Sequence, residues 1–468
     1  MKTLHTRKSW TWLLALMLAL SMALSACGGG GGNKGGNAGG DSGGGSGGSG
    51  GNGGGSSGKR VVVDFWATQM EDFTTKWWER WIEEFNNTND RIEINFEVIP
   101  GDAWDQRMTA AQAAGTAPDI YTMNYNKIAF SADQGKIQAL DEYVDASVWE
   151  DLFDNVEGFV SVAGKHYAYP LLVEPSSILY YRKDFFEEAG LDPNKPPVTW
   201  DELIEYGKKL ATNGRYGLLA AGNAVEIAWT NWGWQGMVGQ FPISDDWSKA
   251  TINNDAYRKL LQFWKDLHAN GVVPKQMPGG YTDILPFGEG RAAMAINGSW
   301  AIGQLRNDFP DILDKVGVAV MPTPDGNQQV PTASLGGWTL VVDGNSDHPK
   351  EAAEFITWML AGNPDIMIDF FKTTKYSKFP ARKSVDEAIN ADPEAQNDEW
   401  RKLVAEKVVP YAVGEPIYAW EISMAYATAV ERVVLQGMDI DKSLEIAEKE
   451  INDYIEANNY AGTNPNLQ

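Results

Sequence analysis

The chain has 468 residues, of which 63 are acidic and 39 basic, and its formal net charge is −24 at pH 7. This acidity makes nucleic acid and anionic lipid poor candidate partners. The chain is long enough to bury the cores of two lobes, and its single cysteine allows no disulfide within it.

The first residues carry the pattern of a secretion signal. A basic start over residues 1–8 precedes an apolar run over 12–23, which is too short to span a bilayer comfortably. The next four residues, Leu24-Ser25-Ala26-Cys27, resemble a bacterial lipobox, in which cleavage occurs before the cysteine and the thiol takes a lipid. We therefore expect a signal peptide at 1–26 and lipidation at Cys27. The alternative is an ordinary buried cysteine behind a signal helix.

A tether is expected at 27–59, because this segment consists almost entirely of Gly, Ser and Asn. Two apparent motifs inside it are discounted. Residues 54–58 imitate a nucleophile elbow and residues 53–59 imitate a phosphate-binding loop, but neither follows a strand. No later segment has eighteen uninterrupted apolar residues.

From about residue 60 the patterns of strand and helix alternate, which predicts an α/β fold with helices on both faces of a sheet. Strands are expected at 61–66, 92–98, 119–123, 177–181, 216–220, 292–296, 316–321 and 339–342. Helices are expected at 77–85, 106–114, 200–210, 255–269, 349–360, 422–436 and 442–457. No clear strand is expected between residues 350 and 460, so the C-terminal region should be helical.

Four segments, taken in order, resemble the extracellular solute-binding proteins of ABC sugar transporters, the maltose-binding-protein-like family. They are Gly115-Thr116-Ala117-Pro118-Asp119-Ile120, residues 164–184, residues 287–300 with Phe287, Gly290, Ala292-Ala293-Met294, Gly298 and Trp300, and residues 316–322 with Gly336-Gly337-Trp338. The resemblance covers nearly all of residues 60–460.

The resemblance implies a two-lobed periplasmic-binding-protein fold that closes on ligand through hinge strands. Lobe 1 would comprise 60–172 and 316–343, and lobe 2 would comprise 177–312 and 347–468. The implied function is a lipid-anchored receptor on the extracytoplasmic face of the cell membrane. It would act as a monomer, capture a sugar or oligosaccharide and deliver it to the permease of an ABC transporter.

Candidate ligand residues come from the carboxyl ends of the predicted strands and from the resemblance. The first strand offers Trp66, Thr68 and Gln69, and the third offers Asn124, Tyr125 and Asn126. Glu174 matches a family carboxylate for sugar hydroxyls, and Trp300 matches a stacking aromatic. The remaining candidates are Glu226, Trp229, Trp232, Trp234, Tyr281, Asp283, Gly337, Trp338, Arg382, Trp420 and Glu421.

The penultimate helix departs from the family pattern. The Trp and Arg of maltose-binding protein there correspond roughly to Met424 and Thr428, which argues against a maltodextrin ligand. An amino-acid or peptide ligand is the alternative within the same fold.

An enzyme is not expected, because the four histidines are scattered and no Cys/His cluster is present. Some paired acids could act as a glycosidase dyad, but chance pairs are frequent among so many acids. We expect no cofactor and no bound metal.

Overall fold

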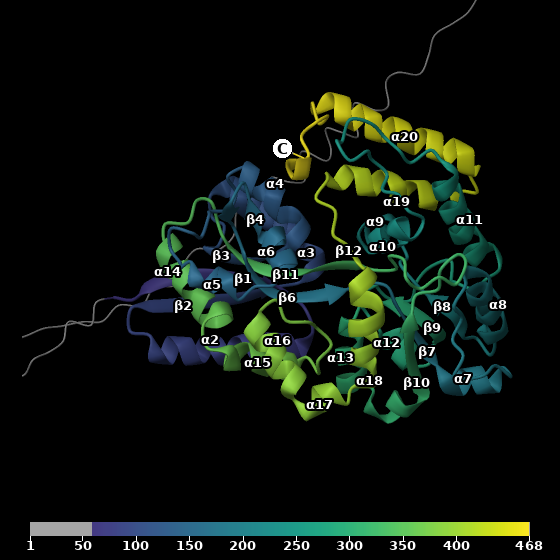
Figure 1. The fold of residues 1–468 in the computed structure, drawn as a ribbon, viewed down its shortest axis with the longest axis horizontal. Helices are drawn as coiled ribbons and strands as arrows, with labels where there is room; N and C mark the ends of the chain where they lie inside the picture. The colour runs from purple at the N-terminus through teal and green to yellow at the C-terminus, as the bar shows by residue number, and fades with distance from the viewer. Residues whose placement is uncertain (1–58, 468) are drawn as a thin grey trace, which may run out of the picture. The chain divides into compact units, whose positions relative to one another are not determined.

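The computed structural model describes residues 59–467 and contains two β-sheets flanked by helices (Figure 1). The predicted signal peptide, the lipidation site Cys27 and nearly all of the tether lie outside these residues. Within residues 59–467, no helix is both long and apolar enough to cross a membrane.

The first sheet has the strand order β12-β11-β3-β1-β2, with β6 also paired to β11. β1 (Val61–Thr68) runs parallel to β2 (Ile92–Ile99) and β3 (Ile120–Asn124). β11 (Ser334–Val342) runs antiparallel to β3 and to β6 (Tyr169–Pro175), and parallel to the short β12 (Val413–Gly414).

Helices cover both faces of the first sheet because successive residues of a strand point in opposite directions. Phe65 of β1 packs against Trp78 of α2 (Asp72–Thr88) and Phe355 of α14 (Pro349–Ile356). The next residue, Trp66, lies under the guanidinium group of Arg107 in α3 (Gly101–Ala114).

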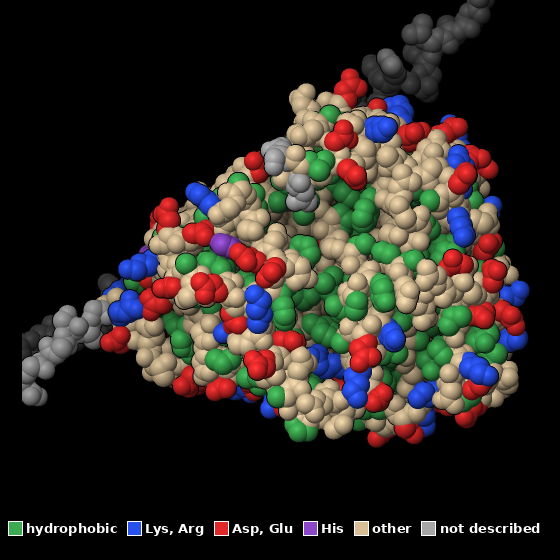
Figure 2. Space-filling model, viewed as in Figure 1, with side chains coloured by type: hydrophobic (Ala, Val, Ile, Leu, Met, Phe, Trp, Pro, Cys, Tyr) green, Lys and Arg blue, Asp and Glu red, His purple; other side chains and the backbone are tan. Residues whose placement is uncertain are grey.

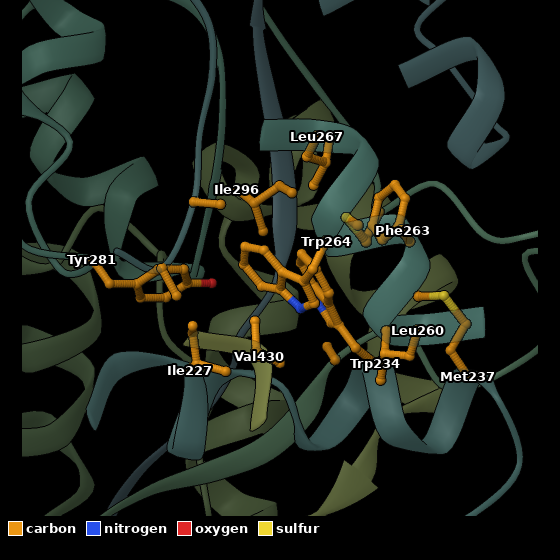
Figure 3. Close-up of a cluster of buried hydrophobic side chains, with 14 of the residues drawn as sticks. Ile227, Trp234, Met237, Leu260, Phe263, Trp264, Leu267, Tyr281, Ile296 and Val430 are labelled. Atoms are coloured by element: carbon orange, nitrogen blue, oxygen red, sulfur yellow. The ribbon is translucent and has the colours of Figure 1, made fainter. Parts of the chain in front are cut away.

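The second sheet has the order β10-β7-β9-β8. β7 (Ile178–Arg182) pairs antiparallel with β9 (Ala292–Asn297) and with β10 (Val316–Val320), and β8 (Tyr216–Leu219) runs parallel to β9. Its apolar cluster includes Trp264 of α11 (Asp255–Ala269), stacked on Trp234 at a centroid distance of 5.0 Å (Figure 3).

Two long helices, α19 (Trp420–Val434) and α20 (Ile440–Ala457), pack against each other and against the apolar cluster of the second sheet. They are drawn in yellow in Figure 1. The Tyr426 hydroxyl of α19 donates to Asn231 Oδ1 at 3.0 Å, and the indole of Trp264 donates to the same oxygen at 3.1 Å. These bonds connect α19 to α11 through one buried side chain.

The other helices are shorter. The α-helices are α4 (Ile128–Asp133), α5 (Ser147–Glu150), α6 (Asp154–Val160), α7 (Lys183–Glu188), α8 (Trp200–Leu210), α9 (Ala224–Thr230), α10 (Trp232–Met237), α12 (Leu285–Gly288), α13 (Trp300–Asp308), α15 (Pro364–Thr373), α16 (Lys383–Ala391), α17 (Pro393–Gln396) and α18 (Glu399–Leu403). Short 3-10 or π turns lie at Tyr125–Lys127, Pro310–Lys315, Thr357–Ala361, Val404–Val408, Val409–Tyr411 and Pro465–Leu467, and β4 (Ser161–Val162) and β5 (Lys165–His166) form a small ribbon.

All eight predicted strands and all seven predicted helices are present; α8 and α11 have the predicted bounds, and the ends of the others are shifted. β6 was not predicted, because its buried residues show no alternation and its apolar run is interrupted by Pro170, Glu174 and Pro175. β12 contradicts the expectation of no strand after residue 350; two residues are too few to leave a pattern.

Two segments lie in a different half from the one expected. β10 belongs to the second sheet through its pairing with β7, although 316–343 was assigned as a whole to lobe 1. Helices α14 to α16 join the apolar cluster of the first sheet, although 347–468 was assigned to lobe 2. The physical reason for the second difference is aromatic packing, since Phe355 contacts Phe65 and Phe370 contacts Trp77.

Candidate functional site

A buried ion-pair cluster lies where the end of β6 meets the start of α2. Lys378 Nζ donates to Glu174 Oε2 at 2.9 Å and to Glu71 Oε1 at 3.0 Å. The side chains are only 2%, 11% and 7% exposed for Lys378, Glu174 and Glu71, respectively. We call these three residues the lysine–carboxylate cluster. It joins three segments that are distant in the sequence.

The cluster has two carboxylates for one ammonium group, and the pKa values reflect this imbalance. Burial alone would lower the pKa of Lys378, but Glu174 and Glu71 raise it above its ordinary value. Burial raises the pKa of Glu174, and attraction to Lys378 only partly opposes that rise.

A third acid, Glu415, follows β12 and lies directly over Gly336 of β11. A Cβ atom built on Gly336 would lie 1.9 Å from Glu415 Oε1. Glu415 Oε2 is buried and has no hydrogen-bond partner among the described residues. Burial raises the pKa of Glu415 to about 8, and the Glu174 carboxylate adds to this rise.

Gly337 allows the backbone of β11 to approach its neighbours closely. Its φ of +153° is rarely adopted by other residues, and an added Cβ would lie 2.2 Å from the carbonyl oxygen of Leu172. Tyr125 is buried and donates its hydroxyl hydrogen to the same oxygen at 3.1 Å. Asn124 Nδ2 reaches the Gly337 carbonyl at 3.5 Å. Thus three predicted site residues, Asn124, Tyr125 and Gly337, lie together.

An aromatic group comprises Trp229, Tyr281 and Trp300. The Trp229 ring lies 5.3 Å from Tyr281 and 6.1 Å from Trp300, measured between centroids. The Tyr281 hydroxyl accepts a hydrogen bond from the Ser177 N–H at 3.3 Å. The indole Nε1 of Trp300 is buried and has no partner among residues 59–467.

The aromatic group adjoins the end of β6 through backbone contacts. The Ser299 N–H donates to the Pro175 carbonyl at 3.0 Å, and Pro175 directly follows Glu174. The Ser176 and Ser334 hydroxyls lie 2.9 Å apart and join the same crossing to β11. The two sheets therefore present the aromatic group and the lysine–carboxylate cluster at neighbouring positions.

Other predicted residues lie nearer to solvent. Trp66 stacks under Arg107, whose guanidinium carbon is 4.2 Å from the ring centroid. Trp338 is half-buried on β11, while Gln69 and Trp420 are exposed. Figure 2 shows hydrophobic side chains gathered in the middle of the face on which β6, β11 and β12 approach α9, α10 and α19 in Figure 1.

Three further candidates have structural partners. Trp232 is buried and donates its indole N–H to Ser423 Oγ at 3.0 Å, and Trp234 donates to Ser177 Oγ at 3.2 Å. Arg382 pairs with Asp151 at 2.7 Å and donates to the Leu360 and Gly362 carbonyls.

Both oxygens of Glu226 accept backbone N–H groups, from Gly222 and Tyr281. Asp283 accepts the N–H of Leu285 at 2.8 Å. These contacts hold the loop before α12 in place.

Sequence reasoning missed Glu71, Lys378 and Glu415. Glu71 lies two residues beyond the predicted loop residue Gln69, so a longer window after the first strand would have included it. Lys378 and Glu415 lie in irregular segments, where periodicity gives no signal. Among residues 59–467 there is no group of three acidic, histidine or cysteine side chains that could hold a metal ion.

Comparisons with known proteins identify the family of the chain. The family described as "Bacterial extracellular solute-binding protein" matches residues 67–361. The maltotriose-binding protein of Pyrococcus abyssi is 26% identical over 323 residues, which cover 68% of this chain and 65% of that protein. The chain thus spans slightly less than two thirds of that relative.

Solved structures show the same fold. A solute-binding protein of Thermotoga lettingae bound with α-D-tagatose gives a TM-score of 0.72 at 24% identity, covering 84% of this chain and 99% of that one. The cyclic α-maltosyl-1,6-maltose binding protein of Arthrobacter globiformis gives 0.67 at 25% identity, covering 85% and 100%. The predicted two-lobed binding-protein fold is confirmed.

Proposed function

Because the chain belongs to the bacterial extracellular solute-binding protein family, we propose that it captures a sugar or oligosaccharide between its two sheets for an ABC transporter. The members of this family are binding proteins, so the expectation that the chain is not an enzyme is confirmed. The two lobes that close would be the two sheets, each with its own apolar cluster and helices.

One observation carries the sugar assignment: an aromatic group adjoins a cluster of buried carboxylates. The rings of Trp229 and Trp300 offer faces for the C–H surface of a pyranose, and Glu174 offers acceptors for its hydroxyls. Pockets that combine aromatic walls with a few fixed polar groups are typical of small-molecule sites. The names of the relatives above support the same ligand class.

Anchoring and delivery are further parts of the proposal. The lipobox-like residues 24–27 support lipidation at Cys27, and the Gly/Ser-rich tether would let the body reach a permease. Ligand that contacts both sheets would favour the closed state, which the permease could then recognise. Retention of radiolabelled palmitate by the wild type but not by Cys27→Ser would support the anchor.

The binding proposal is tested by titrating intrinsic tryptophan fluorescence with a panel of sugars and oligosaccharides, with amino acids and peptides as controls. A saturable change with a glycan, and its recovery unhydrolysed, would support the proposal. A saturable change with amino acids or peptides alone would favour the alternative receptor class. Release of hydrolysis products would indicate a carbohydrate-active enzyme.

A further inference from the structure

The carboxylates of Glu174 and Glu415 share one face of the first sheet. Gly336 lies directly opposite Glu174 in the antiparallel pairing of β11 with β6. Directly opposite residues of such a pair point to the same face, with Cβ atoms about 5 Å apart. Glu415 occupies the space that a Gly336 side chain would fill. The missing side chain of Gly336 thus creates a slot that brings a second carboxylate beside Glu174.

Protein cations balance only part of this negative charge. Lys378 is shared between Glu174 and Glu71. Lys127, which attracts Glu415 from a distance, is paired with Asp105 at 3.0 Å and its side chain is 48% exposed. No ion pair to Glu415 is found among the described residues. The Asn126 N–H donates to its carboxylate, but its Oε2 has no hydrogen-bond partner among them. Burial and, to a smaller extent, the Glu174 carboxylate accordingly raise the pKa of Glu415.

Further buried polar atoms without partners belong to the segment whose backbone is bonded to Pro175, the residue that follows Glu174. Ser299 is fully buried, its hydroxyl has no partner among residues 59–467, and its N–H is bonded to the residue that follows Glu174. The unpartnered indole N–H of Trp300 belongs to the next residue. Buried polar atoms without partners are uncommon in native proteins, and a ligand would supply the missing hydrogen bonds.

We propose that this site takes an amino sugar, whose ammonium group lies between the carboxylates of Glu174 and Glu415 while its ring contacts Trp300. This inference rests on the proposed function and narrows its ligand class. An ammonium group has three donors, which can reach two carboxylates at once. It would also benefit from the nearby aromatic faces. A neutral sugar would leave Glu415 protonated and would gain no ion pair with it.

The test compares pairs of sugars that differ only in having amino groups in place of hydroxyl groups. The pairs are glucosamine with glucose, galactosamine with galactose, mannosamine with mannose, and β-1,4-linked diglucosamine with cellobiose. Calorimetry at pH 7 is performed in two buffers of different ionisation enthalpy. We expect one amine to bind at least tenfold more tightly than its hydroxyl partner. We also expect it to release protons on binding, because an ammonium group would lower the pKa of Glu415.

Two variants test the residues. Glu415→Gln should reduce the preference for the amine at least tenfold and abolish proton release. Gly336→Ala should also reduce the preference for the amine and abolish proton release, because the added Cβ displaces the Glu415 carboxylate. Glu174 and Glu415 both remain in this variant. Glu205→Gln is the matched control, because Glu205 forms an exposed ion pair with Lys209 on α8. It should change neither the preference for the amine nor the proton release. Circular dichroism establishes that each variant is folded.

The inference is overturned if no amine binds more tightly than its hydroxyl partner in any of the pairs. It is also overturned if a neutral glycan binds more tightly than every amine. Either leaves the proposed function intact. If amino acids or peptides bind and no glycan does, the proposed function and this inference fail together.

Discussion

The ammonium group of Lys378 lies 2.9 Å from the carboxylate of Glu174, although 204 residues separate them in the sequence. Both side chains are nearly inaccessible to solvent. Lys378 also holds Glu71 at the start of α2, so one cation links β6, α2 and the segment after α15. The stability of the first sheet and the shape of the candidate site thus depend on the same contact.

Replacing Lys378 should destabilise the protein strongly. Lys378→Met would leave two buried carboxylates without a counter-charge, and removing one partner of a buried ion pair costs about 3–5 kcal/mol. Urea unfolding followed by circular dichroism measures this loss. Lys372→Met removes a cation that is 52% exposed and paired with Asp392, and should change the free energy of unfolding by less than about 1 kcal/mol. Equal effects of the two substitutions would contradict the burial argument.

Glu415 should make the stability depend on pH. Its pKa rises from 4.5 to about 8 on folding, so between these values the folded state holds a proton that the unfolded state releases. The free energy of unfolding should therefore fall as the pH rises through this window. Glu415→Gln should remove this part of the pH dependence. As the pH rises from 4.5 to 8, the free energy of unfolding of the variant should gain at least about 1 kcal/mol relative to that of the wild type. Parallel pH profiles for wild type and variant would show that the carboxyl is not perturbed.

Gly337 should tolerate no side chain. Gly337→Ala would place a Cβ 2.2 Å from the Leu172 carbonyl oxygen at a φ of +153°, so β6 and β11 must separate locally. We expect a loss of about 1–3 kcal/mol in the free energy of unfolding, together with weaker ligand binding. Gly239→Ala is a suitable control, because Gly239 has a φ of +82° but an added Cβ would meet nothing within 4 Å. Similar binding losses in both variants would argue against a role for the close approach.

Trp300 should matter for binding more than another buried tryptophan does. Trp300→Leu removes a ring that contacts Trp229 and Tyr281, and should weaken binding of the responding sugar about tenfold or more. Trp247→Leu removes a ring stacked on Tyr460 at 4.7 Å and should reduce stability without changing the dissociation constant. Calorimetric titration of both variants separates these effects. An unchanged affinity in Trp300→Leu would remove this ring from the proposed site.

Arg382 should serve stability alone. It pairs with Asp151 and donates to two backbone carbonyls, so Arg382→Met would remove all three hydrogen bonds, although Ser384 would still donate to Asp151. We expect a destabilisation of about 1–3 kcal/mol with an unchanged dissociation constant for the folded protein. If Arg382→Met instead lost ligand affinity while keeping wild-type stability, Arg382 would contact the ligand, as the sequence analysis expected.

The regular elements were predictable because their apolar residues recur at the period of the element. Trp77, Trp78 and Phe85 indicated α2, and the uninterrupted apolar run at 316–321 indicated β10. The assignment of segments to sheets was less predictable, because a buried strand carries no mark of its neighbour. β10 shows this clearly, since only its pairing with β7 places it in the second sheet.

The site was predictable where local chemistry showed it and not where it depends on distant contacts. Paired glycines directed attention to Gly337, and the family resemblance directed attention to Glu174 and Trp300. Lys378 and Glu415 become notable only once the chain is folded, because their partners lie in other segments. Arg382 and Trp232 have residue types common in binding sites, but the fold gives them partners in the interior.

Sugar binding at the site that contains Trp300 is tested most directly by titrating tryptophan fluorescence. The wild type and Trp300→Leu are titrated with the same panel of sugars, amino acids and peptides. If the proposed function is right, at least one sugar produces a saturable change in the wild type and a weakened one in the variant. A saturable response of the wild type to amino acids or peptides alone would contradict it.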